Sequence, residues 1–143
     1  MTKNILTGIV LAGVFTLSFF YCNGNSPTET ETPETVKEDP SFSQDIQPVF
    51  TSSCALSNCH NSTAQAGLVL LQGQAYNNIV NVNSTQDSSK KRVEPGNADN
   101  SYLVIKIEGR QSIGGRMPLG GAALSSTRIQ NIKNWIDRGA KNN

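Results

Sequence analysis

The stretch that decides the fold reads Cys54-Ala55-Leu56-Ser57-Asn58-Cys59-His60. It holds two of the three cysteines and the only histidine of a 143-residue chain. Thiols and imidazole are the side chains that bind soft metals and react with cofactors. Because chance seldom brings them together in so short a stretch, residues 54–60 predict a chemical site.

A cysteine pair followed directly by histidine is typical of c-type haem attachment: both thiols bond to haem vinyl groups, and the imidazole binds iron. Four residues separate Cys54 from Cys59, where two are commoner. The longer segment must form a bulge, and Ser57 and Asn58 favour turns. The stretch therefore predicts one covalent haem c held by Cys54, Cys59 and His60.

Two other uses of the same residues stay open. A zinc site needs four ligands, and an Asp or Glu would have to complete the set, because residues 41–143 contain no further Cys or His. A disulfide between Cys54 and Cys59 is chemically easy in an exported protein, but it leaves His60 without a role. Cysteine-protease chemistry is disfavoured, because its histidine comes from a distant segment.

A second signal lies 57 residues downstream of His60, at Met117-Pro118 within the glycine-rich segment 114–121. Apart from Met1, Met117 is the only methionine. In a loop it has no helical neighbours to pack with, and glycine lets the backbone approach a flat ligand. Methionine is a common axial ligand opposite histidine in electron-transfer haems. Met117 is therefore the predicted sixth ligand, with a core-filling role as the alternative.

With these residues the chain resembles the small monohaem bacterial cytochromes c with His/Met ligation, which are found in exported proteins. The resemblance extends over most of residues 41–143. It consists of these segments: Asp45–Phe50, Gly67–Leu70, Val93–Asn97 leading to Ser101–Leu103, Arg116–Pro118, Leu124–Ser125 and Trp135–Ala140. It implies a cytochrome c-like fold around one haem and a role in electron transfer.

The apolar periodicity independently predicts an all-α fold with long loops. Ile46, Val49 and Phe50 predict a first helix, capped by Ser41 or Ser43 and interrupted by Pro48 unless that proline lies in the first turn. A second helix is predicted at 73–80. A third begins after Asn97 as its cap and ends at Gly109. The clearest begins after Ser125, carries Ile129, Ile132 and Ile136 on one face, and ends at Gly139.

The first forty residues predict export and a tether. Residues 1–22 have a positive start, an uncharged apolar run from Ile5 to Tyr21, and then Cys22. Cys22 resembles the lipid-modified cysteine of a bacterial lipoprotein, with an uncleaved membrane anchor as the alternative. Residues 23–40 are rich in proline, threonine and acidic residues, which predicts a disordered tether. We expect the domain at 41–143 on the periplasmic or cell-surface side, with an outer-membrane lipoprotein favoured.

Charge and composition limit the function classes. The chain has a formal net charge of +1, and residues 41–143 alone carry ten Lys/Arg against six Asp/Glu, which is no basic surface for nucleic acid. No second histidine is present for acid–base work, so an electron carrier with protein redox partners is predicted, not an enzyme. A haem-based sensor or peroxidase-like domain and a haem-free, disulfide-containing binding lipoprotein stay open.

Three smaller expectations concern the surroundings of the haem. Arg110 and Arg116 are candidates to pair with its propionates. Pro95 is expected to line the His60 face. The segment Ser84–Ser89 (STQDSS) is expected to be a polar loop with no packing of its own.

Overall fold

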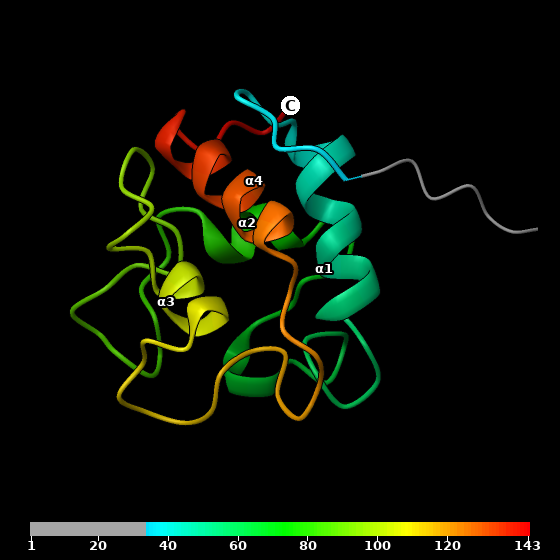
Figure 1. Cartoon of the computed structure of the whole chain (residues 1–143). Helices are drawn as coiled ribbons and strands as arrows, with labels where there is room; N and C mark the ends of the chain where they lie inside the picture. Colours follow the sequence, from blue (N-terminus) through cyan, green and yellow to red (C-terminus); the bar gives the residue numbers. More distant parts are fainter. Residues whose placement is uncertain (1–33) are drawn as a thin grey trace, which may run out of the picture. The chain divides into compact units, whose positions relative to one another are not determined.

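The computed structural model describes residues 34–143, which form a set of short helices joined by long loops (Figure 1). In chain order these are a π-helix η1 (Phe42–Ile46), α1 (Gln47–Ser53), a 3₁₀-helix η2 (Gln65–Gly67), α2 (Ala75–Ile79), α3 (Tyr102–Glu108) and α4 (Ser126–Asp137). Within residues 34–143 the β pairing consists of two isolated bridges. The predicted all-α class is therefore confirmed.

The predicted anchor at 1–22, including Cys22, and residues 23–33 of the predicted tether lie outside the described residues. Among residues 34–143, no helix combines the length and the apolar character that crossing a membrane requires.

Pro48 lies inside a continuous helical segment, at the point where its hydrogen-bond pattern changes. The amide of Ile46 donates to the carbonyl of Ser41 at 3.3 Å, which is the wide turn of η1, and α1 begins at Gln47. Proline has no amide hydrogen to donate, so its cost is smallest where one pattern gives way to the next. Ser41 occupies the N-cap position of η1, as predicted, but its hydroxyl bonds to no helix amide and instead donates to the carbonyl of Asn143 at 2.9 Å.

The last two helices follow the sequence signals closely, apart from one cap. Ser125 caps α4 by accepting a hydrogen bond from the Arg128 amide at 3.2 Å, and Gly109 ends α3 at φ 79°. The predicted cap at Asn97 is wrong, because α3 begins after Ser101. The side chain of Asn97 instead accepts a hydrogen bond from the amide of Asn100 at 3.2 Å, which closes a turn before the helix. Asparagine serves turns and caps equally well, so its type alone did not separate them.

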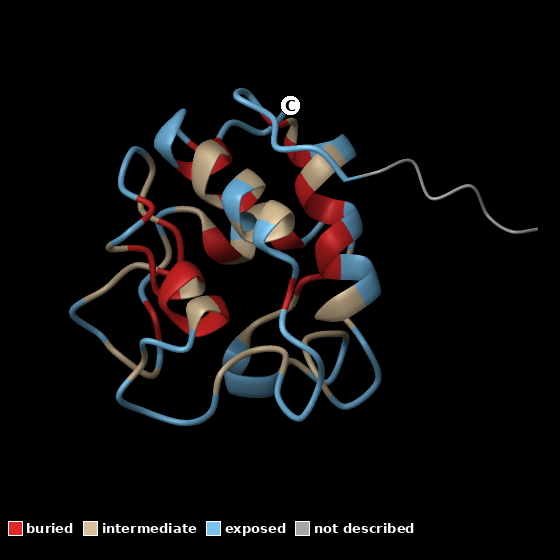
Figure 2. Cartoon of the chain, viewed as in Figure 1, coloured by how far each residue is buried: buried red, intermediate tan, exposed pale blue. Residues whose placement is uncertain are grey.

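The core lies where α4 packs against η1 and α3, and Figure 2 shows the buried residues on the facing sides of these helices. Trp135 is 1 % exposed, and its ring lies 5.2 Å from that of Phe42. The ring of Tyr76, from α2, lies 5.3 Å from Phe42. The indole N–H and the phenol O–H donate to the carbonyls of Lys141 and Ala140, both at 2.9 Å. Both polar atoms are thus buried with their hydrogen bonds formed, and these bonds attach the C-terminal residues to the core.

Residues 34–40 differ from the predicted disordered tether, because they lie along α4. The side chain of Asn131 donates to the carbonyl of Thr35 at 3.0 Å and accepts from the amide of Lys37 at 2.7 Å. Glu34 pairs with Arg128, and Pro40 is fully buried. The residues are as polar as the composition indicates, but α4 offers them partners that composition cannot reveal.

Replacing Ser125 with alanine is expected to lower the free energy of unfolding by about 1 kcal/mol, the usual cost of losing an N-cap. The hydroxyl also donates to Glu34 at 2.7 Å, so the same change loosens residues 34–40. Chemical denaturation followed by circular dichroism measures the effect. Ser126→Ala, at the next and exposed position, is the matched control. Equal stability of the two variants would contradict the cap.

Candidate cofactor site

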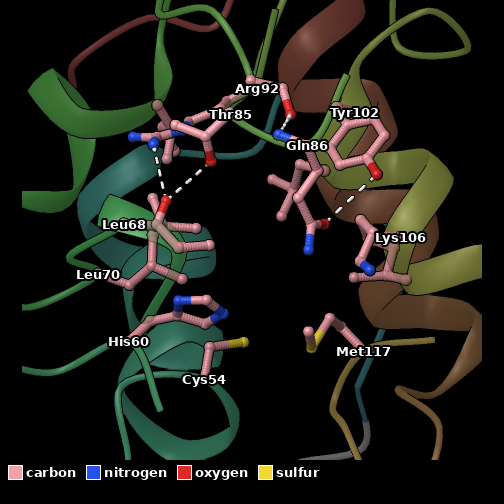
Figure 3. A pocket seen from close by; sticks show the side chains of 15 residues that line it. Cys54, His60, Leu68, Leu70, Thr85, Gln86, Arg92, Tyr102, Lys106 and Met117 are labelled. Atoms are coloured by element: carbon pink, nitrogen blue, oxygen red, sulfur yellow. Dashed lines mark hydrogen bonds between the residues drawn. The ribbon is translucent and has the colours of Figure 1, made fainter. Parts of the chain in front are cut away.

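One cavity gathers the chemistry-bearing residues, and it holds about 670 Å³ of empty space, its open mouth included. Figure 3 shows side chains entering it from several elements. Its walls are mostly apolar, and they comprise Cys54, His60, Ala66, Leu68, Leu70, Ile79, Ser84, Thr85, Gln86, Arg92, Tyr102, Leu103, Lys106, Ile107 and Met117.

The segment between the two cysteines forms the bulge that the sequence predicts. Cys54 directly follows α1, and its carbonyl accepts a hydrogen bond from the amide of His60 at 3.1 Å, which closes the loop. Inside it, the amide of Cys59 donates to Leu56 at 3.0 Å. Asn58 adopts φ 63°, a left-handed conformation that asparagine tolerates better than most residues. The four-residue spacing is therefore accommodated by one turn at Asn58.

His60 is held in a defined orientation at the wall of the cavity. Its Nδ1 lies 3.2 Å from the carbonyl oxygen of Gln65. A carbonyl oxygen only accepts, so Nδ1 carries the hydrogen and Nε2 keeps its lone pair. Figure 3 shows the ring edge pointing into the cavity, toward Met117. Fixing the ring by one nitrogen leaves the other free to bind a ligand.

The imidazole of His60 is also favoured in its neutral form. Burial lowers its pKa, and this outweighs the carbonyls of Leu68 and Gln65, which favour the charged form. The positive charges of Arg92 and Lys106 act in the same direction as burial. A neutral imidazole is the form that binds a metal ion.

The two cysteines are free thiols and lie in different surroundings. Cys54 lines the cavity, whereas Cys59 is not among the lining residues. Burial, together with the neighbouring Cys59, raises the pKa of Cys54 to about 11. The thiol of Cys54 is therefore protonated at neutral pH. In residues 34–143 the alternative disulfide is not formed.

Met117 reaches the same cavity from the loop between α3 and α4. Its amide donates to the carbonyl of Lys106 at 2.9 Å, which holds the loop against α3. The peptide bond between Met117 and Pro118 is cis. The side chain is half-buried, and Figure 3 shows it on the opposite side of the cavity from His60 and Cys54. The structure thus brings together Cys54, His60 and Met117.

The two arginines predicted to face a bound anion do not line the cavity. Arg110 forms an ion pair with Glu108 at 2.6 Å, and the aliphatic part of the Arg116 side chain packs beside Gly109. Arg92 and Lys106 line it instead, and sequence reasoning missed both. Lys106 did carry a signal, because it interrupts the apolar run Leu103–Ile107, where a lysine is unusual.

Two loop expectations also differ from the structure. Pro95 is not a lining residue. The segment 84–89, expected to have no packing of its own, contributes Ser84, Thr85 and Gln86 to the cavity wall. The hydroxyl of Ser84 is buried and accepts hydrogen bonds from the amides of Gln86 and Asp87, both at 3.2 Å. Because the serine hydroxyl forms hydrogen bonds with amides of its own turn, this polar segment can pack against the cavity.

Among residues 34–143, no group of three or more His, Cys, Asp and Glu side chains could hold a metal ion. The zinc alternative thus lacks its ligand set in this part of the chain. Comparisons of the whole chain with protein families, with curated proteins and with solved structures find no match.

Proposed function

We propose that residues 41–143 form a monohaem cytochrome c that carries electrons in an extracytoplasmic compartment. The observation that supports it most strongly is the pairing of His60 and Met117 across one apolar cavity beside Cys54. In this proposal the fold is cytochrome c-like. Cys54 and Cys59 would attach the haem covalently, and His60 and Met117 would bind its iron.

The residues fit this group because, among residues 34–143, the cavity has one imidazole and one thioether on opposite walls, His60 and Met117. An imidazole and a thioether on opposite walls can bind one metal from two sides, which leaves most of a six-coordinate shell unfilled. No cluster of protein ligands in residues 34–143 fills the remainder. A flat group with four donors of its own would complete the shell. The apolar walls around Leu68, Leu70 and Ile107 suit its hydrocarbon body.

When bound, the haem supplies an iron that cycles between two oxidation states. The residues of the chain lower the free-energy cost of this change in oxidation state. His60 is neutral and fixed through Gln65, so its nitrogen needs no proton release before binding. Met117 is held to α3 through its amide, and a thioether favours reduced iron, which raises the potential. Two fixed ligands also leave no open position for a substrate, so we propose a carrier and not an enzyme.

The N-terminal residues complete the proposal. A lipid on Cys22, or an uncleaved anchor, would hold the domain at a membrane, and the segment 23–33 would tether it, because residues 34–40 lie along α4. A tether raises the effective concentration of the domain near its redox partner proteins.

Mass spectrometry of the protein matured in a cytochrome c-competent bacterium tests the proposal. We expect one added haem, which survives a denaturing gel and stains there. Replacing both Cys54 and Cys59 by alanine should abolish the stain. Cys22→Ala is the matched control, because it removes a cysteine that lies outside the stretch 54–60. A wild-type chain without covalent haem would overturn the proposal and favour a haem-free binding lipoprotein.

A further inference from the structure

Two cations line the cavity without a carboxylate partner. Arg92 is 9 % exposed and Lys106 is 6 % exposed, and no ion pair within residues 34–143 includes either. Elsewhere in the same part of the chain, basic side chains such as Lys133 do find acidic partners. Arg92 and Lys106 are therefore buried at the cavity without an acidic partner among residues 34–143.

The bonds these two cations make are to neutral oxygens only. Arg92 donates through Nη1 to the carbonyl of Asn78 at 2.9 Å, and through Nη2 to Gly67 at 3.1 Å and Ala66 at 3.4 Å. Its Nε hydrogen and second Nη1 hydrogen have no acceptor among the described residues. Lys106 makes one long bond, from Nζ to the carbonyl of Ile113 at 3.3 Å. Both groups thus keep donors free for a ligand.

Burying an unpaired charge is costly, because carbonyl dipoles replace only part of the water. Desolvation alone lowers the pKa of Arg92 and of Lys106, with no carboxylate acting against it. A ligand that brings negative charge into the cavity would remove this cost. Two cations call for two anionic groups.

The polar residues also gather at one end of the cavity. In Figure 3, Arg92, Thr85, Gln86 and Tyr102 lie at the end opposite Cys54, and Lys106 lies between Tyr102 and Met117. The phenol of Tyr102 donates to Gln86 Oε1 at 3.4 Å. The cavity is therefore polarised: a thiol is at one end, and hydrogen-bond donors with uncompensated positive charge are at the other.

We propose that Arg92 and Lys106 bind the two propionate carboxylates of the haem. This inference rests on the proposed function, since haem is the group that carries thiol-reactive vinyls on one edge and two carboxylates on another. The two cations then help to orient the haem in the cavity. Their positive charge also favours the reduced iron.

The test compares Arg92→Gln and Lys106→Gln with Arg110→Gln and Arg116→Gln, all in the haem-loaded full-length protein. Each of the first pair should lower the equilibrium constant for reduction by about tenfold, which is about 59 mV for one electron. The control pair removes the same charge outside the cavity and should change it less than twofold. Arg92→Lys, which keeps the charge, should have an equilibrium constant for reduction close to that of the wild-type protein.

A second readout reports the carboxylates directly. The propionate bending band in the resonance Raman spectrum should shift to lower frequency in Arg92→Gln and Lys106→Gln and stay unchanged in the controls. Where a glutamine variant does not fold, Arg92→Met and Lys106→Met, which also remove the charge, take its place in both measurements. An unchanged band and potential in haem-loaded variants would overturn this inference alone. A wild-type chain without haem would overturn the proposed function instead.

Discussion

Replacing His60 by alanine is expected to abolish stable haem insertion and leave residues 41–143 largely unfolded. No other histidine in the chain could take the position. The described helices are short, with α4 spanning Ser126–Asp137 and α2 only Ala75–Ile79, and helices of this length depend on tertiary packing. Without haem, the cavity leaves its apolar walls unpacked. We expect loss of the whole in-gel haem signal and of most of the far-ultraviolet helical signal.

Ser57→Ala is the matched control, since Ser57 is an exposed residue of the same loop. It should keep wild-type yield and colour. Normal amounts of red, folded His60→Ala protein would contradict both the assigned ligand and the dependence of the fold on haem. Haem-free but fully helical His60→Ala protein would contradict only the second.

Replacing Met117 by alanine is expected to change the iron site without unfolding the protein. The loop stays attached to α3 through the backbone bond to Lys106, which alanine also makes. The oxidised wild-type protein should show the weak far-red band of sulfur bound to ferric haem, and the variant should lose it. We expect the equilibrium constant for reduction to fall more than a hundredfold, because axial ligands set haem potentials over about 0.8 V. The reduced variant should bind carbon monoxide rapidly.

Leu119→Ala controls for the loop itself, because Leu119 lies two residues away and is 71 % exposed. Leu119→Ala should keep the far-red band and the reduction potential, and its reduced form should not bind carbon monoxide rapidly. A Met117→Ala protein that keeps them too would show that the sulfur does not bind iron. A wild-type protein that already binds carbon monoxide rapidly would favour the sensor or peroxidase-like alternative.

The sequence by itself determined the features that depend on neighbouring residues. The cap at Ser125, the stop at Gly109 and the turn at Asn58 each follow from the conformations open to one residue type. The candidate ligands were equally accessible, because the chain has one histidine and one methionine besides Met1. A scarce side chain with metal-binding chemistry can be singled out without knowing where the chain folds.

Only the tertiary structure decided which residues from distant segments share the cavity. His60 and Met117 are 57 positions apart, and their placement on opposite walls depends on the bonds of Met117 to Lys106 in α3 and of His60 to Gln65 in η2. Charge alone could not separate Arg92 and Lys106 from Arg110 and Arg116, and only Lys106 carried a further sequence signal, its place in an apolar run. What distinguishes them is burial without a carboxylate, and burial depends on contacts between residues far apart in the chain.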